Sequence, residues 1–128
     1  MKVLDTTFLI DMIHGKKETE KVVESLEPLL TTQINMYEVI RGFIIKKIQQ
    51  KKFLEIIALF ENIRVLPLTD QGIIKASEIS AELMKKGYPA PDCDCLIAGI
   101  ALHNNVRTII TRDDKHFQEI KGLKVEDY

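Results

Sequence analysis

Short segments with strand propensity alternate with longer segments of helical periodicity along most of the chain. The strand candidates are rich in Val, Ile, Leu and Thr and cover residues 3–4, 29–33, 63–66, 107–110 and, as a final edge strand, 124–126. The helical segments cover residues 7–13, 18–26, 35–48, 53–61, 70–86 and 93–104. Strands that alternate with helices in this way predict a parallel sheet covered by helices on both faces. The sequence therefore predicts an α/β fold.

Length and composition predict a single domain over residues 1–128, because 45% hydrophobic and 29% charged residues are ordinary for a globular protein of this size. The apolar runs are shorter than the roughly 20 residues of a membrane span. Acids interrupt the N-terminal stretch MKVLDTTFLID before the apolar core of a secretion signal could form. Two cysteines at i, i+2 fit a reducing compartment. We therefore expect a cytoplasmic protein without a membrane segment.

Acidic residues follow the ends of the predicted strands. Asp5 comes directly after the first strand, Glu38 lies just past the second, and Asp113 and Asp114 follow the fourth. Asp94 opens the helical segment that leads into the fourth strand. The carboxyl ends of parallel strands meet at one edge of the sheet, where α/β proteins bind their ligands. We therefore expect acids from distant parts of the sequence to gather at this edge.

Each of these acids also has a purely structural explanation. Asp5 can cap the helix that begins near residue 7, since Asp is a preferred N-cap. Asn35 and Glu38 have the spacing of a capping box. Asp113 and Asp114 can be ordinary turn residues. The shared location of the acids is harder to explain in this way than any acid taken alone.

Several carboxylates within a few ångströms of one another indicate a cation site. Their mutual repulsion raises their pKa values unless a cation neutralises them. Mg²⁺ binds through one or two carboxylates together with water and substrate phosphates. A cation held in this way orients water and stabilises charge during in-line attack on a phosphodiester. The pattern therefore favours phosphoryl or phosphodiester chemistry.

The stretch PDCDC raises zinc and redox alternatives because it alternates Asp92 and Asp94 with Cys93 and Cys95. Zinc would require three or four Cys or His ligands at matched spacings, and the three histidines of the chain supply no second paired motif. A disulfide between positions i and i+2 would be badly strained. We therefore expect both thiols to fill space, Asp92 to cap the helix and Asp94 to lie in its first turn. We expect His116 at the surface.

Four stretches occur in a consistent order: LDTTFLID, YEVIRG, DCLIAGIAL and IITRDDKHF. Together they resemble the PIN-domain family, and within it the small VapC-like toxin ribonucleases. The resemblance implies a three-layer α/β/α sandwich around a mainly parallel sheet. It also implies a Mg²⁺ or Mn²⁺ site that hydrolyses RNA and is built from the matching acids, which are Asp5, Glu38, Asp94 and Asp113.

Within this set we expect Asp5 and Asp94 to be the direct metal ligands. Glu38 and Asp113 are further candidates, and so are two neighbouring acids, Asp92 and Asp114. Asp113 and Asp114 compete for the position of the fourth acid, and we favour Asp113, two residues after Thr111. The family usually carries Asn two positions after the first acid, where this chain has Thr7, whose side chain can still form hydrogen bonds.

The resemblance further implies a homodimer and a small antitoxin, as in a type II toxin–antitoxin pair. The helical segment from residue 35 independently suggests a partner surface. Its core stripe of apolar residues at helical period consists of Met36, Val39, Ile40, Phe43, Ile44 and Ile48. Tyr37 and Ile45 lie outside this stripe and add apolar surface that one buried face does not need.

RNA requires basic residues to contact its phosphates. Arg112 adjoins Asp113, and Arg41 lies one helical turn beyond Glu38, so both are candidate phosphate contacts. The basic segment over residues 46–52 is more typical of a solvated helix face. The net charge of −1 adds no overall attraction to nucleic acid.

Three other functions remain open from the residues. A receiver-type signalling domain also uses acids and Mg²⁺, but it would have an acid pair after the first strand and an Asp directly after the third. Here Asp5 stands alone, and Pro67, Leu68 and Thr69 intervene before Asp70. An inactive interaction module could retain the fold, and a housekeeping RNA-processing nuclease would share the site.

Overall fold

The five strands form one sheet in which every neighbouring pair is parallel. The computed structural model describes residues 1–128. The strand order is β3-β2-β1-β4-β5. The strands are β1 (Lys2–Leu4), β2 (Leu29–Thr32), β3 (Arg64–Leu66), β4 (Thr108–Ile110) and β5 (Lys124–Glu126). The predicted edge strand is confirmed, because β5 pairs only with β4.

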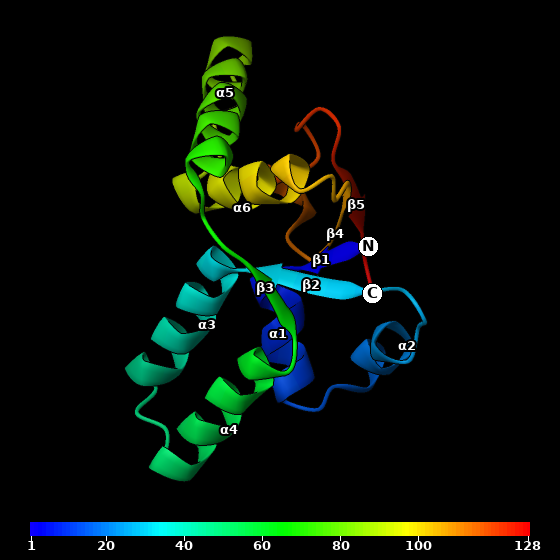
Figure 1. The fold of residues 1–128 in the computed structure, drawn as a ribbon, viewed down its shortest axis with the longest axis vertical. Coiled ribbons are helices and arrows are strands. Elements are labelled where there is room, and N and C mark those ends of the chain that lie inside the picture. The colour runs from blue at the N-terminus through cyan, green and yellow to red at the C-terminus, as the bar shows by residue number, and fades with distance from the viewer.

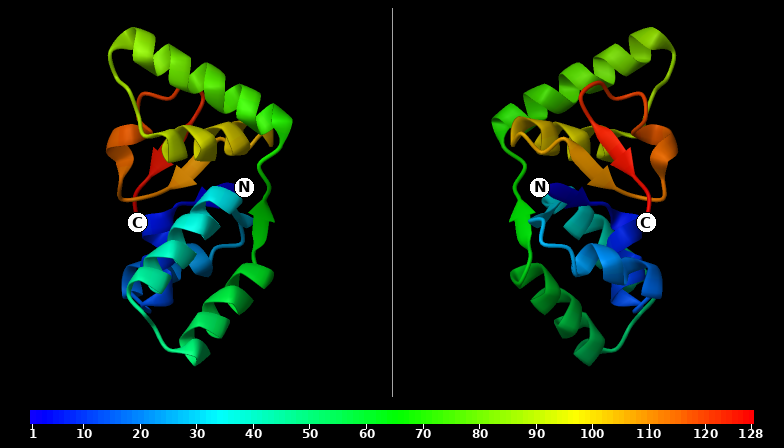
Figure 2. Two further views of the ribbon diagram at one scale, coloured as in Figure 1. Left: turned by 90° about the vertical axis from the view of Figure 1, so that its left-hand side faces the viewer. Right: turned by 90° about the vertical axis from the view of Figure 1, so that its right-hand side faces the viewer.

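Helices cover both faces of this sheet (Figures 1 and 2). One side carries α1 (Thr6–Ile13), α2 (Glu20–Val23), α3 (Gln33–Ile45) and α4 (Gln50–Glu61), and the other carries α5 (Asp70–Lys86) and α6 (Asp92–His103). Two 3₁₀ turns, η1 (Lys17–Thr19) and η2 (Asp114–His116), complete the elements. The predicted α/β fold with a parallel sheet is therefore confirmed.

Alternation along the strands divides the core into two clusters. Val3 in β1 and Ile109 in β4 pack with the buried residues of α5 and α6. Their neighbours Leu4 and Ile110 pack with the buried residues of α1, α3 and α4. Successive side chains of a strand point to opposite faces, so β1 and β4 each contribute to both clusters. This explains why β1 and β4 carry apolar residues at consecutive positions.

The helix α5 packs mainly against α6, and a glycine sets how closely the two approach. A Cβ at Gly99 would lie 2.6 Å from the backbone nitrogen of Ala76 and 2.7 Å from the carbonyl oxygen of Gly72. At the other end of α5, Gly87 adopts a left-handed conformation with φ of 80° and ends the helix. The predicted end of the helical segment at residue 86 is therefore confirmed.

The N-caps of α3 and α6 differ from the expected residues, and the N-cap of α5 lies just before the predicted segment. The cap of α5 is Thr69, whose hydroxyl accepts a hydrogen bond from the backbone N–H of Gly72, and Asp70 is the first helical residue. The N-cap of α6 is Pro91, so Asp92 lies inside the helix. The cap of α3 is Thr32, not Asn35. In α3 and α5 the capping residue has an extended backbone and is the last residue before the helix. A residue whose side chain caps a helix adopts this non-helical conformation.

Two further expectations need correction. The helix expected over residues 18–26 is only the turn η1 followed by α2, and Leu26 is fully exposed, so no core contact extends the helix. Ile44, expected in the core stripe of α3, is also exposed. None of the helices has the length and apolar character needed to cross a lipid bilayer.

Candidate functional site

Asp5 lies at the centre of the sheet edge, directly after β1, and only 4% of it is exposed. It occupies the N-cap position of α1, but its side chain makes no capping hydrogen bond. Instead, its Oδ1 accepts a hydrogen bond of 2.9 Å from Nδ2 of Asn35, and its Oδ2 accepts one of 2.6 Å from the Thr111 hydroxyl. The capping interpretation of this carboxylate is therefore wrong.

Asn35, in the first turn of α3, links Asp5 to Glu38. Its Oδ1 accepts a hydrogen bond from the Thr32 hydroxyl, which orients the amide so that Nδ2 donates to Asp5 and to the Thr6 hydroxyl. Thr6 in turn donates to Oε1 of Glu38 over 2.8 Å. The capping-box interpretation of Asn35 and Glu38 is wrong, because both side chains belong to this network.

Thr111, the residue after β4, connects the opposite side of Asp5 to the loop that carries Asp113. Its hydroxyl accepts a hydrogen bond of 2.9 Å from the backbone N–H of Asp113 and lies 3.2 Å from the Thr7 hydroxyl. Thr7 also accepts a hydrogen bond from the backbone N–H of Arg112. The threonine at position 7 therefore forms hydrogen bonds, as its side chain allows, and fixes the start of this loop.

A second group of side chains adjoins Asp5, where the first turn of α6 meets η2. Nδ1 of His116 lies 2.8 Å from Oδ2 of Asp94 and 3.5 Å from Oδ2 of Asp113. One ligand atom from each of these three residues lies within 4.8 Å of the other two. His116 is partly exposed, as expected of a residue near the surface, but its Nδ1 is buried against the acids. In the sequence, only its position three residues after Asp113 pointed to His116 as part of this group.

The surroundings of Asp5 and Asp94 disfavour the charged form of both carboxylates. Burial, followed by the negative charge of Asp5, raises the pKa of Asp94 to about 6. Burial also raises the pKa of Asp5, although the hydrogen bond from Thr111 opposes this shift. No lysine or arginine side chain forms an ion pair with either acid. A bound cation would relieve this repulsion.

The donors suit a divalent cation. Asp94 and Asp113 supply carboxylate oxygens, and His116 supplies a ring nitrogen whose atom is buried without a hydrogen-bond partner. Asp5 can also contribute, because each carboxylate oxygen keeps a free lone pair beside the hydrogen bond that it accepts. Such a site can orient water and stabilise the charge that develops in hydrolysis.

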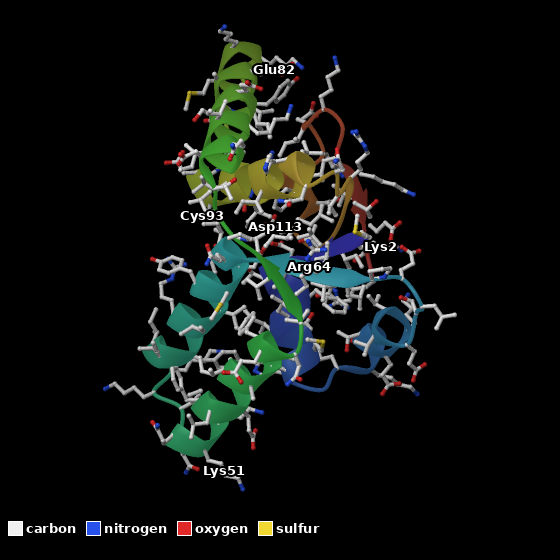
Figure 3. All side chains as sticks on the ribbon, in the orientation of Figure 1. Lys2, Lys51, Arg64, Glu82, Cys93 and Asp113 are labelled. Carbon is white, nitrogen blue, oxygen red and sulfur yellow. The ribbon has the colours of Figure 1, made fainter.

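The first turns of α3 and α6 lie side by side at the left-hand end of the sheet in Figure 1. Figure 3 labels Asp113 and Cys93 in the region between these two helices. The topology therefore brings together residues that are far apart in the sequence, namely Asp5, Glu38, Asp94 and Asp113.

Other candidate acids and the thiols lie outside this group. Asp114 accepts a hydrogen bond of 2.8 Å from Nε2 of Gln118 within η2 and its following turn. Asp92 lines a groove between α5 and α6 together with Cys95. Cys95 is buried, Cys93 is half-buried, and neither belongs to a cluster of possible metal ligands.

Neither of the two candidate RNA-contacting arginines forms an ion pair with an acid of the site. The guanidinium of Arg112 lies 4.5 Å from the centre of the Tyr128 ring, with Nη1 3.7 Å from Oδ2 of Asp11. Arg41 lies over the Tyr37 ring at 4.9 Å and donates a hydrogen bond to the Tyr37 hydroxyl. A role for either arginine in binding RNA stays a prediction.

The sequence of this chain is similar to known proteins over nearly its whole length. A family model described as the PIN domain matches residues 2–123. The chain is 32% identical to Ribonuclease VapC1 of Methanocaldococcus jannaschii, over 98% of this chain and 86% of the relative. It is 27% identical to the tRNA(fMet)-specific endonuclease VapC of Salmonella typhimurium, over 98% and 96%.

Solved structures show the same fold. The crystal structure of DNA-bound VapBC from Salmonella typhimurium superposes with a TM-score of 0.83 at 27% identity, over 98% of this chain and 96% of that one. VapBC2 from Rickettsia felis, bound to a DNA fragment from its promoter, superposes with a TM-score of 0.84 at 20% identity, over 99% and 98%.

Proposed function

Because this chain belongs to the PIN-domain family, we propose that it is a divalent-metal-dependent endoribonuclease, the toxin of a type II toxin–antitoxin pair. The observation that carries the proposal is the group of acids at the sheet edge, where the pKa of Asp94 is raised to about 6. The names of two relatives, Ribonuclease VapC1 and tRNA(fMet)-specific endonuclease VapC, support the same reaction class.

We propose that Asp5, Asp94 and Asp113 hold the cation, Mg²⁺ or Mn²⁺, with Glu38 beside them. When bound, the cation supplies charge stabilisation at the phosphodiester and makes a water molecule more acidic. Asn35 and Thr111 fix both oxygens of Asp5, so the carboxylate does not have to reorganise during the reaction. Thr6 fixes Oε1 of Glu38, which leaves Oε2 free to accept a proton from the attacking water.

Cleavage of an end-labelled RNA tests this proposal. Asp5→Asn and Asp94→Asn should abolish Mg²⁺- or Mn²⁺-dependent cleavage, as should a chelator added to the native protein. The matched control is Asp114→Asn, which should retain activity because Asp114 bonds to Gln118 instead. Products with a 2′,3′-cyclic phosphate would contradict attack by water, and undiminished cleavage by Asp94→Asn would contradict the site.

For RNA binding we propose phosphate contacts from Arg41 and Arg112. Arg41 is exposed and lies one turn from Glu38 on α3. Arg112 would have to reach the RNA from its position over Tyr128. Arg112→Ala should weaken binding of a non-cleavable RNA and reduce its salt dependence by about one phosphate contact, without moving the cleavage position. An unchanged salt slope would exclude Arg112 and make the basic segment over residues 46–52 the next candidate.

We propose that the exposed face of α3 binds protein partners, both the antitoxin and a second copy of the chain. A groove of about 540 Å³ follows this face, and most of its lining residues are apolar. Tyr37, Ile44 and Ile45 are all more than half exposed. Structures of VapBC complexes among the similar folds support an antitoxin partner.

Ile45→Glu tests this surface, because the side chain is 71% exposed and should tolerate a charge without loss of stability. The variant should lose both self-association and antitoxin binding in analytical ultracentrifugation. Met84→Glu on α5, at a side chain that is 61% exposed, is the matched control and should associate normally. Equal behaviour of the two variants would exclude the α3 face.

A further inference from the structure

His116 presents a buried polar atom that the chain itself does not satisfy. Its Nδ1 is inaccessible to solvent and has no hydrogen-bond partner. It lies 2.8 Å from Oδ2 of Asp94, close enough for a hydrogen bond, but the two groups are not aligned for one. Buried nitrogen atoms are nearly always paired, so this atom calls for an explanation.

The position of the ring is fixed by the structure on both sides. Before it, the backbone N–H of Asp113 is bonded to Thr111. After it, Phe117 is fully buried, and its backbone N–H closes the turn on the carbonyl of Asp114. About 35% of the His116 side chain is exposed while Nδ1 is buried, so the exposed part of the ring is the edge away from the acids.

Two roles would place an imidazole nitrogen against two carboxylates. In the first role Nδ1 would donate a hydrogen bond to one of the acids, but it is not aligned for a hydrogen bond with Asp94. A neutral histidine with its proton on Nε2 would direct the Nδ1 lone pair toward the space that it shares with Oδ2 of Asp94 and Oδ2 of Asp113. A lone pair and two carboxylate oxygens form a ligand set for a metal ion.

We infer that His116, through Nδ1, is a direct ligand of the cation together with Asp94 and Asp113, and that this nitrogen makes the site prefer Mn²⁺ to Mg²⁺. The inference rests on the proposed metal-dependent function and adds a ligand to it. Mg²⁺ takes oxygen ligands and retains its waters, whereas first-row transition ions accept imidazole. An all-carboxylate site would lack this preference.

Electron spin-echo spectroscopy of Mn²⁺ bound to the full chain tests the inference directly. A nitrogen ligand produces a hyperfine coupling, which should change when histidine is labelled with ¹⁵N. The coupling should disappear in His116→Gln and persist in His103→Gln, a control at an exposed histidine at the end of α6. Competition of Mg²⁺ against Mn²⁺ should also show that His116→Gln lowers the preference for Mn²⁺ by about tenfold, within the range for altered metal surroundings.

The outcomes separate this inference from the proposed function. Binding of Mn²⁺ with no histidine coupling, or a coupling that persists in His116→Gln, would overturn the inference and leave the metal site in place. Absence of any saturable Mn²⁺ binding would overturn the proposed function itself. His116→Asn provides a second variant with the same expected losses if His116→Gln does not fold.

Discussion

At the scale of single residues, neutral polar side chains rather than cations hold the central acid. Asp5 receives hydrogen bonds from an amide and a hydroxyl, and neither group neutralises its charge. The sequence predicted that the acids would gather, because strand ends fix their location. It could not predict the roles of Asn35 and Thr111, because these depend on contacts with Asp5 across 30 and 106 positions of the chain. The role of His116 depends on side-chain orientation, which the sequence does not show.

The raised pKa of Asp94, about 6, predicts how stability depends on pH in the absence of metal. Between pH 4 and 6 the folded state keeps a proton on Asp94 that the unfolded state has released. The free energy of unfolding should therefore fall as pH rises through this range, by on the order of 2 kcal/mol, and level off above pH 6. Asp94→Asn removes this part of the dependence, so urea unfolding of both proteins should show an advantage of the variant that grows from pH 4 to 6. A difference that is constant with pH would contradict the shift.

Cys93 and Cys95 are predicted to fill space only. Burial raises the pKa of both thiols, which keeps them protonated at neutral pH and unsuited to bind zinc or act as nucleophiles. The double Cys93→Ala, Cys95→Ala variant should lose about 1–3 kcal/mol of unfolding free energy and keep its nuclease activity. Loss of stoichiometric zinc together with activity would show that the thiols bind metal.

At the scale of elements, the sequence predicted which helices and strands exist better than where the helices begin. Thr69 precedes Asp70, and Thr32 precedes Asn35, so more than one polar residue could cap each helix. The residue that caps is the one whose backbone is still extended. This depends on the φ and ψ angles of a single residue, which the hydrophobic periodicity of the sequence does not indicate. The stop at Gly87 was predictable because the left-handed conformation strongly favours glycine.

The packing of α5 on α6 predicts opposite effects for two glycine substitutions. Gly99→Ala forces a Cβ against the backbone of α5, with contacts of 2.6–2.7 Å. This substitution should lower the free energy of unfolding by about 1–3 kcal/mol. Gly42→Ala in α3 meets no atom within 4 Å and should stabilise by about 0.5–1 kcal/mol through helix propensity. Thermal unfolding of both variants checks the prediction, and a neutral Gly99→Ala would mean that the two helices can move apart freely.

At the scale of the whole molecule, two apolar clusters pack on opposite faces of the sheet, and the acids that repel one another lie at one of its edges. The strands hold Asp5 and Thr111, while α3 and α6 bring Glu38 and Asp94 from opposite sides of the sheet. Alternation of strands and helices made this architecture predictable from sequence. The organisation as a single domain over residues 1–128 stays a prediction, and so does the homodimer. The stability of the molecule is therefore expected to depend on what occupies the acidic edge.

Unfolding of the native protein and of Asp94→Asn, each at pH 7.5 with and without Mn²⁺, tests the central claim most directly. Without metal, Asp94→Asn should be the more stable protein, because the substitution removes a charge that is partly buried and repelled by Asp5. At a metal concentration of about 100 times Kd, the native protein should gain about 2.7 kcal/mol, and the variant should gain far less, so that the order of stability reverses. A native protein that Mn²⁺ does not stabilise, or a variant that gains as much, would contradict the claim that these acids hold a divalent cation.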